Sequence, residues 1–175
     1  MPIDTSIDFI AINIAIITVS DTRTLENDTS GYTLEDRITE AGHHMINRII
    51  IPDDISQIKE NLEIMSNRKD IDCIITTGGT GLTGRDTTPE AVKEIASKHI
   101  DGFGELFRQI SFNKIGTSAI QSRAVAALIN GTYVFCLPGS IGACKDGWDE
   151  ILKYQLDIRH KPCNFVEIMP RLNEK

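Results

Sequence analysis

The sequence predicts a three-layer α/β/α domain with a mostly parallel central sheet. Strongly apolar segments rich in isoleucine alternate along the chain with segments of helical periodicity. The segment 10–19 (IAINIAIITV) is almost continuously apolar, as expected for a parallel strand that is buried on both faces. A later apolar segment, 71–75 (IDCII), leads through a glycine-rich loop into a helix start, which is the order of a β–α unit.

A single domain is predicted over residues 1–175. A chain of 175 residues is long enough for one hydrophobic core, and 41% hydrophobic with 25% charged residues is ordinary for a globular protein. We interpret residues 1–9 as a loose N-terminal arm. Residues 161–175 form a C-terminal tail that is unusually apolar around Phe165.

Charge and cysteine usage narrow the class of protein. The net charge of −7 argues against nucleic acid or an anionic membrane as a partner. The four cysteines form no C-x-x-C pair, and Cys73 and Cys136 lie in apolar, strand-like runs, which indicates buried thiols in a reducing compartment. Because no long apolar span, signal-peptide pattern or lipidation pattern is present, we expect a cytoplasmic protein.

The elements before the glycine-rich loop are bounded by cap and breaker residues. The first strand ends at the polar pair Ser20-Asp21, and Pro52 ends the second strand before a helix that Asp53 or Asp54 caps. In chain order we predict a strand at 10–19, a helix capped by Ser30 that runs to 41, a strand at 45–51, a helix from about 54, and a strand at 71–75.

The second half of the chain is predicted from the same signals. A helix begins at 88–90 (Thr-Pro-Glu) and is expected to continue to Lys98, and Gly131 is interpreted as a helix stop. In chain order we then predict a helix at 101–110, a loop at 116–122, a helix at 123–130, a strand at 132–137 (TYVFCL), and a long helix from 138 to about 159.

The stretch 76–90 (TTGGTGLTGRDTTPE) is the most informative part of the chain. Its glycines at 78, 79, 81 and 84 permit positive φ angles and close approach of a ligand to the backbone. Exposed N–H groups beside a helix N-terminus favour binding of phosphate or a similar anion. A plain β–α turn is the alternative, but that turn needs one glycine rather than four.

Two well-known phosphate-binding patterns match this loop only in part. Residues 79–84 match G-x-G-x-x-G, but the helix signals come only at Thr88, and no second strand with a ribose-binding acidic residue follows about 20 residues later. The same residues match half of a P-loop, with Arg85-Asp86 in place of the Lys-Ser/Thr pair. A carboxylate at Asp86 repels phosphate unless a cation lies between them, so Asp86 is either a metal ligand or a local cap of the turn.

Further motifs accompany this loop. They are TVSD at 18–21, IPDD at 51–54, GFGE at 102–105, QSRA at 121–124 and LPGS at 137–140. Together with TTGGTG, the following Asp and TPEA, they resemble the molybdopterin-binding domain family of molybdenum cofactor biosynthesis, which includes the MoaB, MogA and gephyrin-like proteins. The resemblance spans residues 14–140 and is strongest to the MoaB branch.

The resemblance implies a fold, an assembly and a reaction. It implies a mixed sheet with one antiparallel strand, a homotrimer or homohexamer, and transfer of AMP from ATP to molybdopterin with release of pyrophosphate. It also implies that Asp53 and Asp86 are catalytic and associate with the Mg²⁺ of the bound ATP. The residues that it implies for substrate binding, in the pterin and nucleotide pocket, are Ser20, Asp21, Gly78, Gly79, Thr80, Gly81, Ser122, Arg123, Pro138, Gly139 and Ser140.

Two other functions are compatible with the sequence. One is a molybdopterin-binding protein of the pathway with little or no transferase activity, and the other is a nicotinamide-dependent oxidoreductase based on the G-x-G-x-x-G match. Many adenylylating members of the family have Asn at the position of Cys136. A contact that the Asn amide makes in those proteins therefore cannot be assigned directly to this chain. The pair His43-His44 is expected to be exposed, and no structural zinc or calcium site is predicted.

Overall fold

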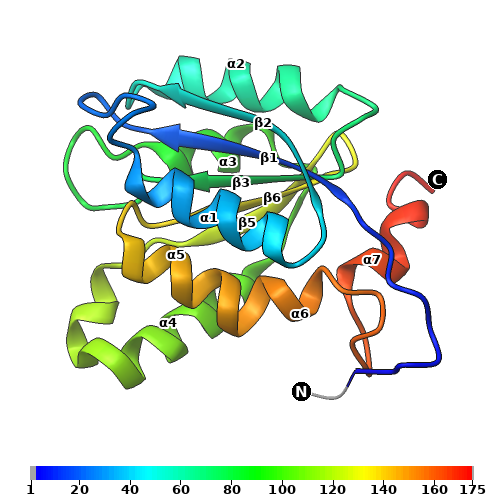
Figure 1. The fold of residues 1–175 in the computed structure, drawn as a ribbon. Coiled ribbons are helices and arrows are strands. Elements are labelled where there is room, and N and C mark those ends of the chain that lie inside the picture. The colour runs from blue at the N-terminus through cyan, green and yellow to red at the C-terminus, as the bar shows by residue number, and fades with distance from the viewer. Residues whose placement is uncertain (1–2, 175) are drawn as a thin grey trace.

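A computed structural model describes residues 3–174 and contains one six-stranded sheet between two layers of helices (Figure 1). The strand order is β2-β1-β3-β6-β5-β4. The strands are β1 (Asn13–Val19), β2 (His44–Ile51), β3 (Cys73–Thr77), β4 (Lys98–His99), β5 (Val125–Ile129) and β6 (Thr132–Leu137). The strand β5 is antiparallel to both of its neighbours, while β2, β1, β3 and β6 pair in parallel. The predicted mixed α/β/α architecture is therefore confirmed.

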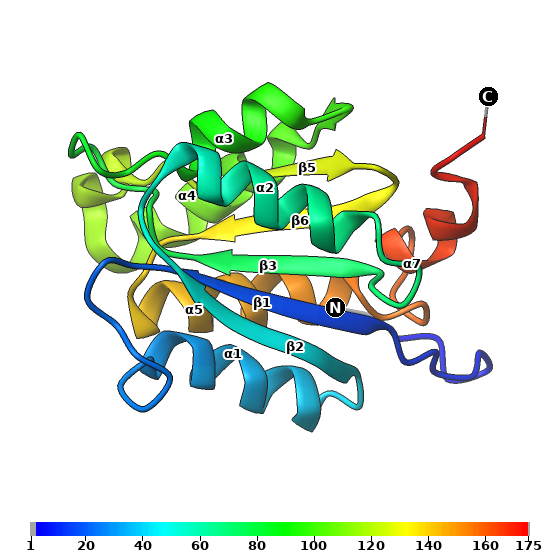
Figure 2. The same cartoon turned by 90° about the horizontal axis from the view of Figure 1, so that it is seen from above.

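The helices divide between the two faces of the sheet (Figures 1 and 2). They are α1 (Thr29–Glu40), α2 (Ile55–Ser66), α3 (Thr88–Ile95), α4 (Asp101–Ile115), α5 (Ile141–Gly147), α6 (Lys153–Gln155) and α7 (Phe165–Ile168). One apolar core lies between the sheet and α1, α4 and the α5–α6 region, and a second core lies under α2 and α3. None of the helices between residues 3 and 174 is long and apolar enough to cross a membrane.

The region 123–130 is a strand and not the predicted helix. Its alanines favour a helix, but residues 125–129 pair with β6 along their whole length, and 126–129 are buried in the sheet. Asn130 and Gly131 both have positive φ, at 52° and 80°, and connect the two strands as a two-residue hairpin. Gly131 is thus a hairpin residue rather than a helix stop.

Other boundaries also differ from prediction, and Asp28 rather than Ser30 is the N-cap of α1. Lys98 belongs to the short edge strand β4 and not to the preceding helix, which ends at Ile95. Residues 116–121, predicted as a loop, form a 3₁₀ helix. The long C-terminal helix begins at Ile141, passes through a π-helical segment at Trp148–Leu152, and ends at Gln155.

The predicted arm and tail both pack onto the rest of the domain. Ile3 forms an antiparallel bridge with His160, and the Asp4 N–H donates to the carbonyl of Arg159, so the described part of the arm, 3–9, is not loose. In the tail, Phe165 packs against the core and Val166 is buried. Within 3–174, Cys73, Cys136 and Cys144 are buried free thiols, as predicted for the first two, and burial raises the pKa of Cys144 to about 11.

Candidate functional site

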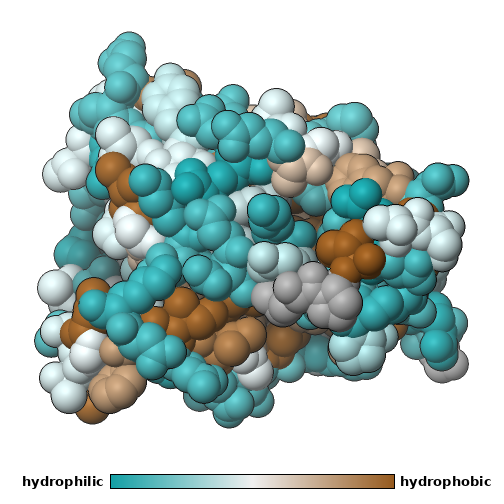
Figure 3. Space-filling view, turned by 60° about the horizontal axis from the view of Figure 1, so that its bottom comes forward, coloured by the Kyte–Doolittle hydropathy of each residue, from teal (hydrophilic) through white to brown (hydrophobic). Residues whose placement is uncertain are grey.

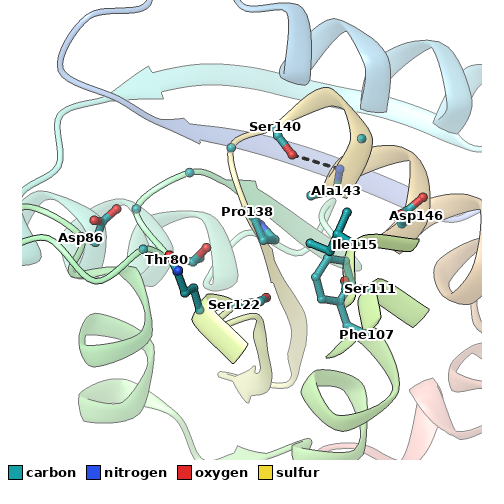
Figure 4. A pocket seen from close by; sticks show the side chains of 16 residues that line it. Thr80, Asp86, Phe107, Ser111, Ile115, Ser122, Pro138, Ser140, Ala143 and Asp146 are labelled. Atoms are coloured by element: carbon teal, nitrogen blue, oxygen red, sulfur yellow. Dashed lines mark hydrogen bonds between the residues drawn. The ribbon is translucent and has the colours of Figure 1, made fainter. Parts of the chain in front are cut away.

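A cavity of about 530 Å³ lies beyond the carboxyl ends of β3 and β6. The glycine-rich loop after β3 and the Pro138 segment after β6 form one side, and α4 and α5 form the other (Figure 4). Nine residues predicted for the site line this cavity: Gly78, Gly79, Thr80, Gly81, Asp86, Ser122, Pro138, Gly139 and Ser140. The convergence expected at the carboxyl edge of a parallel sheet is therefore present.

The backbone of the glycine-rich loop requires glycine at its first two positions. Gly78 and Gly79 have φ of +103° and +63°, which L side chains rarely adopt. A Cβ at Gly78 would lie 2.2 Å from the carbonyl oxygen of Val19 at the end of β1. Thr88, at the start of α3, holds the loop in place, because its N–H donates to the Gly79 carbonyl and its hydroxyl donates to the Gly78 carbonyl. Thr88 is the first residue of α3, as the sequence predicts, and Thr87 is in the N-cap position.

Asp86 closes the glycine-rich loop on itself. Its Oδ2 accepts hydrogen bonds from the backbone N–H of Thr83 at 2.9 Å and from the Thr83 hydroxyl at 2.6 Å. Burial acts to raise the pKa of Asp86, but these hydrogen bonds and one from the Gly81 N–H lower it overall. The carboxylate is therefore held ionised at the end of the cavity formed by the glycine-rich loop (Figure 4).

Arg123 supports the loop from outside the cavity. Its guanidinium donates to the carbonyl oxygens of Gly81 at 2.7 Å and Asp86 at 2.8 Å, and it pairs with Glu90 on α3. This side chain positions the loop backbone, which differs from the direct ligand contact that the resemblance implies.

Asp53 has no capping role. Asp54 is the N-cap of α2, where its Oδ1 accepts from the N–H groups of Ser56 and Gln57. The Oδ1 of Asp53 is buried without a hydrogen-bond partner and lies beside Gly79, 2.7 Å from where a Cβ on that residue would be. Burial raises the pKa of Asp53, and the nearby carboxylates of Asp21 and Asp86 raise it further.

Ser20 and Asp21 lie beside this cavity rather than in its wall. Both line a shallower, open depression between the end of β1 and the edge strand β2. The Ser20 hydroxyl accepts from the N–H groups of Thr22 and Arg23, so it stabilises a turn. The Asp21 carboxylate accepts from the Asp53 N–H at 3.1 Å and pairs with Arg85, which links this depression to the glycine-rich loop.

Comparison with known proteins decides the family. Residues 15–158 match the family model described as "Probable molybdopterin binding domain". The chain is 45% identical over 160 residues to Molybdenum cofactor biosynthesis protein B of Escherichia coli K12, an alignment that covers 91% of this chain and 94% of the relative. The chain belongs to the molybdopterin-binding domain family.

Solved structures agree with this assignment. A crystal structure of a Molybdenum cofactor biosynthesis protein B superposes with a TM-score of 0.85 at 38% identity, covering 94% of this chain and 98% of the other. The tungsten cofactor synthesizing protein MoaB from Pyrococcus furiosus superposes with a TM-score of 0.72 at 34% identity, covering 81% and 91% of the two chains. The MoaB branch indicated by the motifs is thus supported by sequence and by fold.

The end of the cavity remote from Asp86 was not predicted from this molybdopterin-binding domain's sequence. It is formed by Phe107, Ser111 and Ile115 of α4 and by Asp146 of α5, and Asp146 lies at the opposite end from Asp86 in Figure 4. The three α4 residues follow the i, i+4, i+8 spacing of one helix face. Ser111, a small polar residue between Phe107 and Ile115, was the one sequence feature that could have indicated a cavity on this face. Other lining residues that the sequence reasoning missed are Gln121, Gly142 and Ala143.

This end is mainly apolar, with Ser111 and Asp146 as its polar groups. Phe107 is buried, whereas Ile115 is exposed. On the underside of the domain, hydrophobic side chains gather in the lower centre of Figure 3. Ser140 caps α5 through a hydrogen bond from the Ala143 N–H, drawn in Figure 4. The cavity therefore joins a polar end made of backbone and carboxylate groups to an apolar end suited to a flat ring system.

The carboxylates at the polar end fit a nucleotide-bound Mg²⁺. Mg²⁺ is usually held by one or two carboxylates together with substrate phosphates and water. Within residues 3–174 no three or more His, Cys, Asp or Glu side chains are arranged to hold a metal ion by themselves. Asp86 lines the cavity and is ionised, while Asp53 lies just outside the lining, against Gly79, with an Oδ1 that has no partner. The two carboxylates match the smaller requirement, and a cation beside Asp53 would offset the burial that raises its pKa.

Proposed function

We propose that this domain acts in molybdenum cofactor biosynthesis by binding molybdopterin and adenylylating it with Mg-ATP. A phosphate oxygen of molybdopterin attacks the α-phosphorus of ATP, the bond to the bridging oxygen breaks, and pyrophosphate leaves. The product carries AMP on the former terminal phosphate. The observation that supports this most directly is the unpartnered, buried Oδ1 of Asp53 beside a glycine-rich loop that also presents Asp86.

The two ends of the cavity suit the two parts of molybdopterin. The apolar end at Phe107 and Ile115 provides a surface for the pterin ring, and the glycine-rich loop at Gly78–Gly81 suits its phosphate. With the pterin ring at the apolar end, the phosphate of molybdopterin points toward the polar end. The nucleotide must bind at that end, because the phosphate attacks it. Positioning of this kind accounts for a large share of catalysis in phosphoryl and nucleotidyl transfer.

Charge is the main obstacle to this reaction. Two unit negative charges 4 Å apart repel by roughly 4 kcal/mol at an effective dielectric of about 20. A helix N-terminus offsets roughly 0.3–1 kcal/mol of this, which is too little for several phosphate charges. A bound Mg²⁺ supplies charge neutralisation and polarises the reacting phosphoryl group. Asp53 and Asp86 are the residues that would hold it beside the glycine-rich loop.

The test is a single-turnover assay of AMP transfer from ATP to molybdopterin with Mg²⁺ titrated. Asp53→Asn and Asp86→Asn are expected to lose at least about a hundredfold in rate, the effect of several kcal/mol of transition-state stabilisation. Both should retain molybdopterin binding, because that ligand alone needs no nucleotide metal. Asp54→Asn is the matched control, since Asn also caps helices well and this position faces α2 rather than the cavity.

Equal rates and equal Mg²⁺ dependence for wild type and Asp53→Asn would overturn the catalytic assignment. If the wild-type domain binds molybdopterin but transfers no AMP, the protein is a binding component of the pathway. That outcome would leave the cavity assignment intact and remove the transferase activity.

A further inference from the structure

An exposed ion pair lies beside the polar end of the cavity, outside its lining residues. Arg85 donates from Nε to Asp21 Oδ2 at 3.0 Å and from Nη2 to Asp21 Oδ1 at 2.8 Å. The side chains are 62% and 39% exposed, respectively. Because Arg85 belongs to the glycine-rich loop and Asp21 follows β1, the pair joins two segments that otherwise meet at Gly78 and Val19.

This ion pair brings the positive charge of Arg85 next to a group of carboxylates. The Asp53 N–H donates to Asp21 Oδ1, and the Asp53 Oδ1 itself is buried with no partner. Asp86 approaches the same loop from the side of Gly81. The other guanidinium at this loop, that of Arg123, is occupied by backbone carbonyls and Glu90. Arg85 is thus the cationic side chain that faces Asp21 and Asp53.

An ion pair of this kind exchanges partners easily. Exposed pairs between charged side chains contribute little to stability and are screened by salt. A guanidinium that meets phosphate oxygens forms charge-assisted, bidentate hydrogen bonds with a more highly charged partner. A nucleotide that arrives with its cation therefore offers Arg85 a stronger partner, and the cation in turn replaces the charge that Arg85 had supplied.

We propose that Arg85 is a cation placeholder and a phosphate-binding residue. Without nucleotide it neutralises Asp21 and its neighbouring carboxylates. When a nucleotide binds with a divalent cation, Arg85 transfers from Asp21 to the phosphate oxygens, and the cation takes over the neutralisation of the carboxylates that Arg85 had provided. The inference rests on the proposed nucleotide-binding function and adds to it a residue and a local rearrangement.

The proposal makes two predictions of opposite sign for Arg85→Met. In a calorimetric titration with Mn²⁺ alone, Arg85→Met should bind the ion about tenfold more tightly than wild type, because the competing positive charge of Arg85 is gone. Titration with ATP at a Mn²⁺ concentration that saturates both proteins should show binding at least about tenfold weaker, because a charge-assisted phosphate contact is lost. Asp21→Asn should weaken Mn²⁺ binding.

Arg68→Met is the matched control. Arg68 forms a bidentate, exposed pair with Asp70 at 3.0 and 2.7 Å, and the cavity does not include either residue. Its replacement should leave both affinities unchanged. A merely structural role for Arg85 predicts the same null result for Arg85→Met, with at most a small loss in melting temperature.

The two proposals fail in different ways. Unchanged Mn²⁺ affinity or unchanged ATP affinity in Arg85→Met would overturn the placeholder role. Absence of ATP binding by the wild-type protein would overturn the adenylylation proposal and the phosphate-binding part of this one. In that case the comparison with Mn²⁺ alone still decides whether Arg85 occupies the place of a cation.

Discussion

Adjacent carboxylates at the start of α2 have different roles because of their backbone geometry. Asp54 has extended backbone angles and its Oδ1 accepts two backbone N–H groups, which is the pattern of an N-cap. Asp53 precedes it and lies against Gly79. The sequence alone leaves both residues as candidate caps, since each precedes the first helical residue. Only the structure assigns the cap and so leaves Asp53 free for a ligand.

His43 is a residue whose prediction was wrong. It follows a helix stop and was expected to be exposed, but it is 5% exposed and contacts Phe9 and Trp148. Its Nδ1 accepts a hydrogen bond from the Ile12 N–H at 3.3 Å, so the buried ring is neutral. Burial lowers its pKa to about 4, although the charge of Asp157 acts in the opposite direction.

This burial predicts a loss of stability in acid. An unfolded histidine titrates at about 6.5, so between that pH and about 4 the unfolded state binds more protons than the folded state. The free energy of unfolding should therefore be fully retained above pH 6.5 and should fall by up to about 3 kcal/mol as the pH drops toward 4. Urea unfolding across this range measures the change.

His43→Asn isolates the contribution of His43, because the amide oxygen can still accept from the Ile12 N–H and does not titrate. The pH dependence of its unfolding free energy should be flatter than that of wild type. His44→Asn, at the exposed neighbour, should keep the wild-type slope. Parallel curves for wild type and His43→Asn would show that this ring is not responsible.

At the scale of elements, the strands buried on both faces were predictable and β5 was not. The strands β1, β3 and β6 are apolar runs between polar residues, which indicates a buried parallel strand. The strand β5 (VAALI) has alanines that favour a helix, and its strand conformation depends on pairing with β6 and β4. The Asn130-Gly131 pair carried the information needed, because Asn-Gly between apolar runs favours a two-residue hairpin.

The candidate site was predictable where one short segment forms it. The glycine-rich loop and the Pro138 turn are continuous in sequence and have composition cues of their own. The wall made by Phe107, Ser111 and Asp146 comes from helix faces that meet only after folding. Such side chains follow the ordinary helical period, so nothing local distinguishes a cavity wall from a core face.

A test at the scale of this loop compares two of its glycines. A Cβ at Gly79 would lie 2.3 Å from the Thr88 hydroxyl and 2.7 Å from Asp53 Oδ1, and its φ of +63° adds strain. Gly79→Ala should therefore lower the free energy of unfolding by about 1–3 kcal/mol and weaken molybdopterin binding. Thermal denaturation and equilibrium titration measure the two effects.

Gly84→Ala is the matched control in the same loop, because a Cβ there meets nothing within 4 Å and φ is not positive. It should leave stability and binding close to wild type. If both variants bind molybdopterin normally, the close packing of the loop on Asp53 is irrelevant to the ligand and the loop assignment is wrong.

At the scale of the whole molecule, the sheet order explains how the site forms. The strands β1, β3 and β6 are neighbours and parallel, so the segments that follow them emerge at one edge of the sheet. These segments contain Asp21, the glycine-rich loop and Pro138. Asp53 arrives from β2 on the other side of β1. The remaining wall comes from α4 and α5, which pack on the same face of the sheet.

The exposed surface of α4 and the following 3₁₀ helix is the candidate for a subunit interface. The tail around Phe165 is apolar, but it is no candidate for subunit contacts, because Phe165 and Val166 pack onto the core of their own chain. Phe112 and Ile120, by contrast, are 57% and 84% exposed and line one shallow depression of about 300 Å³ with Ala119. Exposed apolar side chains that gather around a hollow are typical of a surface that another protein covers.

We propose that copies of this chain cover that surface in a homotrimer or homohexamer. Light scattering at micromolar concentration should give three or six times the chain mass of 19.4 kDa. The double variant Phe112→Glu/Ile120→Glu should shift the mass to that of the monomer, because two carboxylates would be buried without partners on association. Ile64→Glu, at an exposed residue of α2 on the opposite layer, should leave the assembly unchanged. A monomeric wild type would exclude the assembly itself, whereas an intact oligomer in the double variant would move the interface to another surface.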